Sequence, residues 1–444
     1  MSSAFGLRQP LLVFTRPPVP PPIEGGGYPS ILAFGGTISV SAVPGGLFFV
    51  SDDQSITALI YVQHLLGIGH LVRAGALARG LEAAGIRVVL VSGGMPASLR
   101  GAPASRFEQL PPVRAADESF KVLVDEAGDA IDESFEALRR KRLLEIFDSE
   151  RPDVVVTELY PFGRRRMRFE LDALLERARA LRGQTGLPLI VSSVRDILVP
   201  PADAKRVDEI VKRVQRKYDL VLVHGDEALI PFRRSFDRAG DIADVTRSTG
   251  YVLDPVPERQ GPGAPGYDEI IVSAGGGAVA EALMHAAIGA RELCSLRDRT
   301  WRVLVGYNYP EKAFHARRAA APRGVVVERA RDDFTQLLAN CALSISQGGY
   351  NTVSEILATA ARAVCLPFAG GRETEQTLRC RVLAERGLLQ SVEANDVSAE
   401  QVALAVEKAL TAPPTRGHAV DTNGAQRSAA LLLDAVRVGR TPIS

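Results

Sequence analysis

Two glycine-rich turns in the second half of the chain have the form of anion-binding loops. One contains Ser273, Gly275, Gly276 and Gly277, and the other contains Gln347, Gly348 and Gly349. Each turn follows an apolar run and precedes residues at helical spacing, which predicts a strand, a tight loop and a helix. Backbone amides and the helix dipole at such a helix start favour a phosphate or diphosphate, and glycine lets the ligand approach. We therefore expect both turns to face one ligand of this kind.

Thr352 and Glu355 follow the second turn and allow two interpretations. In a helix capping box, Thr352 would cover the amide three residues later, and Glu355 would bond back to the first amide. In a nucleotide site, both residues would instead contact the ligand. The residues alone leave both interpretations open.

A histidine occupies a third turn, Gly67-Ile-Gly69-His70, between a predicted strand and a predicted helix. The positive end of a helix disfavours an imidazolium ion, so we expect His70 to be neutral near pH 7 and able to accept a proton. A histidine at a helix start without any function is the alternative.

Several arginines follow the predicted strand that ends at Glu158; they are Arg164, Arg165, Arg166 and Arg168. Guanidinium groups bind phosphates through paired N–H donors, so this run, together with Glu158, predicts a site for an anionic acceptor. A solvated helix face is the alternative for such a basic run.

Glu375 and Gln376 open a helix after a predicted strand that ends at Pro367-Phe368. Polar side chains at this place would point toward the two glycine turns and could bind the hydroxyl groups of a sugar. A helix start that only adds solubility is the alternative.

Neither a metal ion nor a bound cofactor is expected. Asp52-Asp53 precedes the predicted fold and Asp332-Asp333 is predicted to begin a helix, so neither pair makes a convincing metal site. No Gly-x-Gly-x-x-Gly motif with a downstream acidic residue fits the turn at Gly275 to Gly277, which disfavours a dinucleotide.

The composition is that of a globular protein. The chain has 444 residues, 46% hydrophobic and 24% charged, which is enough for about two or three domains. A net charge of +1 gives no indication of bulk nucleic-acid binding. The four cysteines are irregularly spaced, which favours an intracellular, reduced protein. No uninterrupted apolar run of about 18 residues predicts a membrane span, so we expect any contact with a membrane to be at its surface.

The elements that must hold these residues alternate between strands and helices. Strands are predicted at 56–62, 86–91, 153–157, 188–192, 219–224, 269–273, 302–306, 324–328, from 342, and at 363–367. This alternation predicts an α/β protein with parallel, doubly wound sheets, arranged as two Rossmann-like domains with a cleft between them.

Changes in composition suggest the domain boundaries. Residues 1–55 are rich in Pro, Gly and Ser and are expected to be a low-order extension or an artefact of the assumed start, with a small hairpin as the alternative. Residues 56–250 are predicted as an N-terminal Rossmann-like domain and 251–418 as a C-terminal one, and 419–444 as a last helix and tail. The Pro- and Gly-rich stretch to Gly266 is expected to connect the two domains.

The order of Gly348, Gly349, Thr352, Glu355 and Gln376 resembles the donor domain of a known enzyme family. This is the peptidoglycan lipid-intermediate N-acetylglucosaminyltransferase family, of the glycosyltransferase family 28 C-terminal type, and the likeness covers roughly residues 56 to 410. It implies a GT-B fold, a nucleotide-activated and typically UDP-linked sugar donor, and transfer by inversion without a bound metal.

The resemblance also implies roles for individual residues. Glu355 would hold the ribose, the glycine turns with Thr352 the diphosphate, Gln376 the donor sugar, and His70 would lie near the acceptor oxygen. The turn at Gly67 and Gly69 lacks the fuller glycine run and the following proline of the family. Glu375 stands where an amide is typical, which leaves the sugar open because a carboxylate cannot donate hydrogen bonds.

We therefore predict a hexosyltransferase that moves a UDP-GlcNAc-like sugar to an unidentified acceptor. The acceptor is expected to be anionic or lipid-linked, with a soluble glycan or small metabolite as alternatives, and the protein to be cytoplasmic or at the inner face of the membrane. A nucleotide-sugar epimerase of the same fold and a non-catalytic nucleotide-sugar binding protein are the alternatives; a flavin or nicotinamide oxidoreductase is disfavoured.

Overall fold

The computed structural model describes residues 55–97, 104–117, 120–274, 278–307, 309–368, 374–393, 397–413 and 420–440. The predicted N-terminal extension, with its alternative hairpin, lies outside these residues except for its last position. Gly275, Gly276 and Gly277 also lie outside them.

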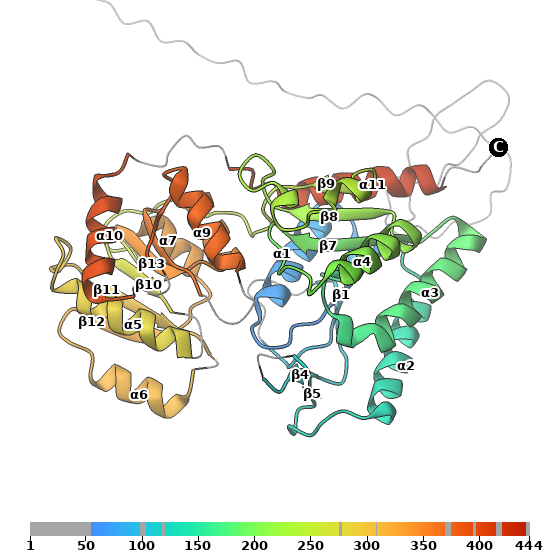
Figure 1. The fold of residues 1–444 in the computed structure, drawn as a ribbon, viewed down its shortest axis with the longest axis horizontal. Coiled ribbons are helices and arrows are strands. Elements are labelled where there is room, and N and C mark those ends of the chain that lie inside the picture. Colours follow the sequence, from blue (N-terminus) through green and yellow to red (C-terminus); the bar gives the residue numbers. More distant parts are fainter. Residues whose placement is uncertain are drawn as a thin grey trace, which may run out of the picture. The chain divides into compact units, whose positions relative to one another are not determined.

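The first half of the chain builds a parallel sheet whose order is β3-β2-β1-β6-β7-β8-β9. The neighbouring strands β7, β8 and β9 of this sheet are labelled in Figure 1. Its strands are β1 (Thr57–Val62), β2 (Arg87–Ser92), β3 (Arg106–Gln109), β6 (Val154–Glu158), β7 (Leu189–Arg195), β8 (Leu220–His224) and β9 (Thr246–Ser248). Strand order reverses between the neighbours β1 and β6, and such a switch point is where open α/β sheets bind ligands. A short antiparallel pair, β4 (Arg114–Ala115) and β5 (Leu123–Val124), is separate from this sheet.

Helices cover both faces of this sheet because its strands are apolar on both sides. Ala58 and Ile60 of β1 pack with α1 and α11, whereas Leu59 and Tyr61 pack with α2, α3 and α4. The helices are α1 (Gly69–Ala83), α2 (Glu133–Glu150), α3 (Arg168–Thr185), α4 (Ala204–Lys217) and α11 (Gly424–Arg440), and the 3-10 turns are η1 (Arg165–Met167), η2 (Phe232–Arg234) and η3 (Ala239–Ile242). The helix α11 therefore belongs to the core of the first sheet, although it follows the second in sequence.

The second half repeats the plan with a parallel sheet of order β12-β11-β10-β13-β14-β15. Its strands are β10 (Ile270–Ser273), β11 (Trp301–Val305), β12 (Val325–Arg329), β13 (Leu343–Gln347), β14 (Ala363–Leu366) and β15 (Gln390–Ser391). The order reverses between β10 and β13, which gives a second switch point.

Helices also cover both faces of the second sheet. Ile270 and Val272 of β10 pack with α5, α6 and α10, whereas Ile271 packs with α7, α8 and α9. These helices are α5 (Ala278–Arg291), α6 (Glu311–Ala319), α7 (Phe334–Asn340), α8 (Tyr350–Thr359), α9 (Glu375–Glu385) and α10 (Ala399–Thr411). Both halves are thus doubly wound and parallel, as predicted.

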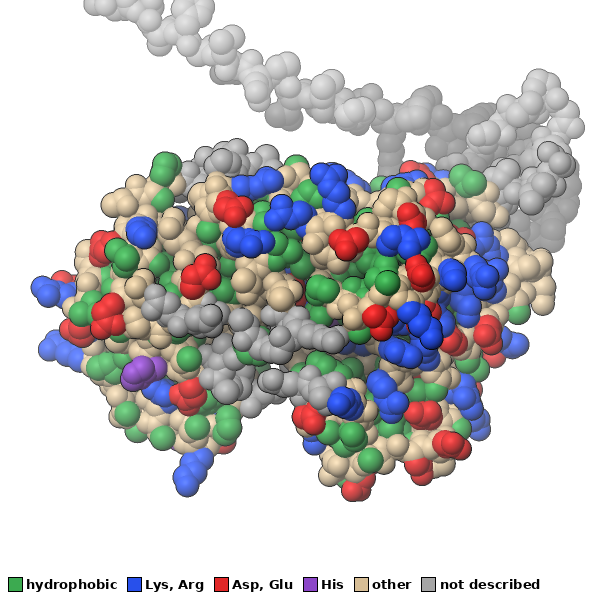
Figure 2. Space-filling model, viewed as in Figure 1, with side chains coloured by type: hydrophobic (Ala, Val, Ile, Leu, Met, Phe, Trp, Pro, Cys, Tyr) green, Lys and Arg blue, Asp and Glu red, His purple; other side chains and the backbone are tan. Residues whose placement is uncertain are grey.

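The surface carries both signs of charge. Basic and acidic side chains are interspersed on the face shown in Figure 2, in agreement with the net charge of +1. Within the described part of the chain, no helix is long and apolar enough to cross a membrane.

His224, at the end of β8, is a buried histidine away from any charged hydrogen-bond partner. Its ring nitrogens lie 2.8 Å from the hydroxyl of Ser193 and 2.8 Å from the hydroxyl of Thr249. Burial lowers the pKa of His224 to about 3. The folded protein therefore keeps this ring neutral in a pH range where the unfolded chain protonates it.

We expect stability to fall on acidification because of this difference. Between the unfolded pKa near 6.5 and the folded pKa near 3, the unfolded chain binds a proton that the folded chain excludes, so the free energy of unfolding decreases as pH falls. Each such histidine contributes up to about 1.4 kcal/mol per pH unit. Urea titrations between pH 7 and pH 4 would measure the slope, and His224→Gln should reduce it. An equal slope in the variant would contradict the assignment.

Candidate active site

His70 and three of the predicted acceptor-side residues, Gly67, Gly69 and Glu158, lie at the switch point of the first sheet. β1 ends at Val62, and the chain then passes through Gly67 and Gly69 into α1, whose second residue is His70. The neighbouring strand β6 ends at Glu158. His70 and Glu158 are in contact, with Nδ1 of the ring 2.8 Å from Oε1 of the carboxylate.

Arg73, one turn after His70 on α1, donates to the same oxygen of Glu158. Glu158 is only 1% exposed and Arg73 only 3%. Burial by itself would raise the pKa of Glu158, but the interactions with His70 and Arg73 outweigh it and lower that pKa to about 2. The carboxylate is therefore ionised at neutral pH and can only accept hydrogen bonds.

His70 is neutral at neutral pH, as predicted. The main reason is burial and not the helix dipole. Burial lowers the pKa of His70 to about 3, although Glu158 opposes this shift. Because ionised Glu158 only accepts, the ring proton lies on Nδ1, and Nε2 keeps its lone pair. Nε2 can therefore accept a proton from a hydroxyl group.

The arginine run divides between two places, so neither a single acceptor patch nor a single solvated face describes it. Arg164 has a left-handed backbone (φ 56°), and its Nε donates at 2.6 Å to the carbonyl of Gln63 just after β1. Its charge contributes to lowering the pKa of Glu158. Arg165 and Arg166 are exposed on η1 and line a separate pocket of about 460 Å³ with Glu136, Arg168 and Phe169.

The predicted donor-side turns begin at the switch point of the second sheet. β10 ends at Ser273 and β13 ends at Gln347, and Ser273 lies opposite Ser346 in the parallel register. Both turns therefore leave the same edge from adjacent strands, which is the arrangement that one diphosphate requires. Because Gly275 to Gly277 lie outside the described residues, their contact with a ligand stays a prediction.

Gly348 and Gly349 serve different purposes. A Cβ atom at Gly348 would lie 2.3 Å from Sγ of Cys380 and 3.4 Å from the carbonyl oxygen of Gln376, so close packing against α9 requires glycine. Gly349 has nothing within 4 Å of such an atom and is the N-cap of α8. The first amides of α8 are thus approachable past Gly349.

The capping box predicted for Thr352 and Glu355 is wrong. α8 begins at Tyr350 with Gly349 as its extended N-cap, so Thr352 already lies within the first turn of the helix. Glu355 instead accepts a hydrogen bond at 2.9 Å from the hydroxyl of Thr335 in α7. A capping box therefore does not account for Glu355. Its role in holding a ribose stays a prediction.

Glu375 is buried, so the alternative of a solubilising helix start is wrong. It is 2% exposed, and its carboxylate forms ion pairs with Arg195 and with Arg379, the latter at 2.8 Å. Gln376 accepts a hydrogen bond at 3.0 Å from the backbone N–H of Phe368. The sugar contacts predicted for Glu375 and Gln376 stay predictions.

Arg379 on α9 joins the donor turn to the first sheet. Its guanidinium group is fully buried and donates to both oxygens of Asp196, at 2.6 and 3.1 Å, and to the carbonyl of Gly348 at 3.0 Å. Asp196 directly follows β7, whereas Gly348 directly follows β13. A buried ion pair therefore holds the backbone of the donor turn.

A second bond joins the donor turn to the turn that carries His70. The side-chain amide of Asn351, on the first turn of α8, donates to the carbonyl of Gly69 at 3.0 Å. The ring of Tyr350 adds contacts with the guanidinium groups of Arg73 and Arg379, at 5.1 and 5.8 Å from its centroid. The predicted base and one of the predicted diphosphate loops thus lie side by side.

Five residues of this cluster were not predicted from the sequence: Arg73, Arg195, Asp196, Asn351 and Arg379. Arg195 and Asp196 follow a predicted strand at its carboxyl end, the edge where ligands bind, so their place could have been found. Nothing in the sequence around Arg379 indicates its role, because its partner Asp196 is distant in sequence.

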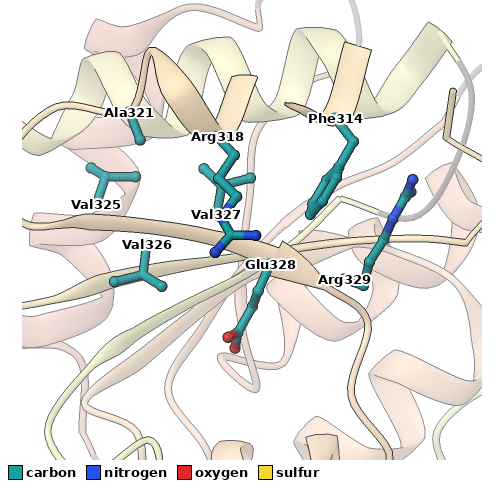
Figure 3. Close-up of a pocket in the computed structure, with 8 residues that line it drawn as sticks. All are labelled: Phe314, Arg318, Ala321, Val325, Val326, Val327, Glu328 and Arg329. Carbon is teal, nitrogen blue, oxygen red and sulfur yellow. The ribbon is translucent and has the colours of Figure 1, made fainter. Parts of the chain in front are cut away.

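A groove far from these residues runs along the edge strand β12 beneath α6 (Figure 3). Its lining includes Val325, Val327 and Phe314, and the guanidinium of Arg329 stacks 4.2 Å from the Phe314 ring. None of the predicted site residues takes part in it, so it is not the candidate site.

Comparisons with known proteins show what the second half of the chain is similar to. Residues 270–432 match the glycosyltransferase family 28 C-terminal domain. This match begins at β10 and contains both predicted diphosphate turns, Glu355, Glu375 and Gln376. The second half of the chain is therefore similar to a glycosyltransferase family 28 C-terminal domain.

Solved structures define the fold class as GT-B. The chain is similar to MurG of Acinetobacter baumannii, with a TM-score of 0.50 and 16% identity over 85% of this chain and 99% of that one. It is also similar to the glycosyltransferase SnogD of Streptomyces nogalater, with a TM-score of 0.54 and 18% identity over 86% and 100% of the two chains. A UDP-GlcNAc 2-epimerase of Methanocaldococcus jannaschii has a TM-score of 0.50 and 12% identity over 85% and 99%.

A curated relative resembles part of the chain more closely. It is the UDP-N-acetylglucosamine--N-acetylmuramyl-(pentapeptide) pyrophosphoryl-undecaprenol N-acetylglucosamine transferase of Paraburkholderia xenovorans, 30% identical over 203 residues. These residues are 45% of this chain, and they span only 50% of the relative. The resemblance drawn from the sequence, to a GT-B glycosyltransferase of this type, is confirmed.

Proposed function

We propose that this protein is a glycosyltransferase that moves a hexose-type sugar from a UDP-linked donor to an acceptor hydroxyl, with inversion and without a bound metal. The observation that carries the proposal is the hydrogen bond from Asn351 to the carbonyl of Gly69, at 3.0 Å. It puts the start of α8, in the family 28 domain, next to the turn that carries a neutral histidine. A transferase needs these two features side by side.

His70 is the proposed base. Its Nε2 atom accepts the proton of the acceptor hydroxyl as the oxygen attacks the anomeric carbon of the sugar. Glu158 holds the opposite ring nitrogen and stabilises the imidazolium ion that forms, while Arg73 keeps Glu158 ionised. Glu158 is therefore a positioning residue for His70.

The donor-side turns are proposed to hold the leaving nucleoside diphosphate. The amides that follow Gly349, at the start of α8, and the turn after Ser273 leave the same edge of the sheet. The amides at the start of α8 are held in a helix before the reaction, so they stabilise the growing negative charge without reorganisation. Thr352 and Glu355 lie on α8, where Thr352 would contact the diphosphate and Glu355 the ribose.

The acceptor is proposed to be anionic, and a lipid-linked diphosphate is the favoured form. The name of the curated relative includes a pyrophosphoryl-undecaprenol compound, and in this chain the charge of Arg164 acts on the proposed base, His70. This acceptor would place the protein at the cytoplasmic face of a membrane, in contact with its surface only.

Calorimetric titration with UDP, other nucleoside diphosphates and their sugar conjugates tests the donor, and mass spectrometry of reactions with lipid-linked and soluble acceptors tests the transfer. We expect UDP and UDP-GlcNAc to bind and UDP to be released only when an acceptor is present. Isomerised sugar in reactions with UDP-GlcNAc alone would favour the epimerase, whose fold is similar. Binding without donor consumption by any acceptor would favour a non-catalytic binding protein.

Glu355→Ala should weaken UDP binding by about tenfold or more, as expected for the loss of a hydrogen-bonded carboxylate. Because Glu355 is not a helix cap, the melting temperature should change little. Calorimetry and thermal denaturation of the same sample measure both quantities. Thr335→Val, which removes the hydroxyl that bonds to Glu355, is the control for packing between α7 and α8. A lower melting temperature with unchanged affinity would remove Glu355 from the nucleotide site.

A further inference from the structure

Arg195 is a half-buried arginine that the acceptor-side sheet presents toward the donor side. It is the last residue of β7, and β7 pairs with β6 so that Ser193 lies opposite Glu158. Arg195 therefore lies at the same carboxyl edge as the proposed base. Its side chain is 15% exposed, enough for a ligand to reach it.

The partner of Arg195 belongs to the donor-side sheet. The guanidinium group forms an ion pair with Glu375, the first residue of α9. One turn later, Arg379 bonds to the same carboxylate at 2.8 Å and to the carbonyl of Gly348 at 3.0 Å. Only the carboxylate of Glu375 and the guanidinium group of Arg379 thus lie between Arg195 and the donor turn.

Several buried polar atoms at this edge have no hydrogen-bond partner among the described residues. Nε of Arg195 and Nε of Arg73 are buried without a hydrogen-bond partner, and so is Oε2 of Glu158. Buried donors without partners are unfavourable, so a ligand that accepts from them would bind favourably. Burial lowers the pKa of Arg164, and the nearby charges of Arg195 and Arg73 lower it further, although Glu158 opposes the shift. An anion at this edge would relieve the repulsion between these positive charges.

We propose that Arg195 binds the diphosphate of the nucleotide donor and stabilises it as the leaving group. This rests on the proposed function. In the transfer, the bond between the anomeric carbon and the diphosphate oxygen breaks, and its electron pair goes to that oxygen. The bond to the acceptor oxygen forms, and the acceptor proton passes to Nε2 of His70. The guanidinium of Arg195 neutralises the added charge on the diphosphate from the acceptor side, opposite the amides of α8.

Glu375 competes with the diphosphate for Arg195 in this proposal. Both are anions, and the ion pair with Glu375 must loosen when the diphosphate arrives. Removing the charge of Glu375 should therefore help the binding of UDP, whereas removing the charge of Arg195 should hinder it. A purely structural ion pair predicts instead that both changes act in the same direction.

Calorimetric titration with UDP and with uridine tests the assignment. Arg195→Gln should lower the affinity for UDP about tenfold or more and leave the affinity for uridine unchanged, because uridine has no phosphate. Arg195→Lys, which keeps the charge, should recover part of the loss. Arg302→Gln is the matched control: Arg302 is 16% exposed and ion-paired, but it lies near the amino end of β11. We expect UDP to bind this variant normally.

The double variant Arg195→Gln with Glu375→Gln separates the two explanations. If Arg195 contacts the diphosphate, the double variant binds UDP as weakly as Arg195→Gln alone, and Glu375→Gln alone binds UDP at least as tightly as the wild type. Normal UDP affinity in the double variant would show that the ion pair of Arg195 and Glu375 has only a structural role, and would overturn the proposal. Equal UDP affinity of the wild type and Arg195→Gln would overturn it as well, and leave the proposed function standing. A wild-type protein that binds no nucleoside diphosphate would overturn both.

Discussion

Turnover of the His70→Ala variant should fall by about 10² to 10⁴ fold, the usual contribution of a general base. The affinity for UDP should change little, because His70 contacts Glu158 of the acceptor side rather than the donor turns. Initial rates with saturating donor, together with calorimetry of UDP binding, measure the two quantities. Unchanged turnover would exclude His70 from the mechanism.

The pH profile gives an independent check on the same residue. The pKa of His70 is lowered to about 3, so the base is in its active, neutral form from there upward. We expect no loss of turnover due to His70 between pH 8 and pH 5. Glu158→Gln should lower turnover, because an amide no longer stabilises the imidazolium ion, and should leave UDP binding unchanged. A steep loss of wild-type activity near pH 6.5 would contradict the buried environment of His70.

Arg379→Met should destabilise the fold by about 3 to 5 kcal/mol, as expected when one partner of a buried ion pair is removed. Asp196 and Glu375 would then remain as buried carboxylates, and the carbonyl of Gly348 would lose its donor. Urea denaturation measures the stability. Nucleotide binding should weaken too, because the donor turn loses its support.

Arg177→Ala provides the control for this prediction. Arg177 and Asp148 form an ion pair on the surface, with exposed fractions of 56% and 46%. Water and salt already solvate such a pair, so its removal should not shift the urea midpoint measurably. A small effect of Arg379→Met, comparable to this control, would mean that Asp196 and Glu375 are satisfied without Arg379.

Local patterns in the sequence predict most of the fold. The apolar runs at 56–62 and 188–192 correspond to β1 and β7 within a few residues, because fully buried parallel strands need continuous apolar sequence. The short edge strands β3 and β9 were not predicted in this way. They are partly exposed and contain polar residues such as Arg106 and Arg247, so they lack a continuous apolar run. The domain boundaries follow from composition alone and stay predictions.

The site was predicted less completely than the fold. Glycine turns and a helix-start histidine are visible in the local sequence, so His70 and the Gln347–Gly349 turn could be proposed as site residues from it. The pairing of Arg379 with Asp196 depends on the tertiary fold, since the two residues are 183 positions apart. The helix start at Tyr350 shows the same limit at short range, because the sequence allows both a capping box at Thr352 and a glycine N-cap at Gly349, only three residues apart.

The return of α11 to the first sheet affects how the two halves can separate. The outgoing chain at Tyr251 and the incoming chain at Asp421 and Gly424 are bonded to one another, with N···O distances of 2.7 and 3.1 Å. The two crossings of the chain are therefore held side by side. Limited proteolysis of the exposed stretch 258–263 would therefore yield fragments that stay associated, since the C-terminal fragment remains anchored through Ala425, Leu432 and Val436.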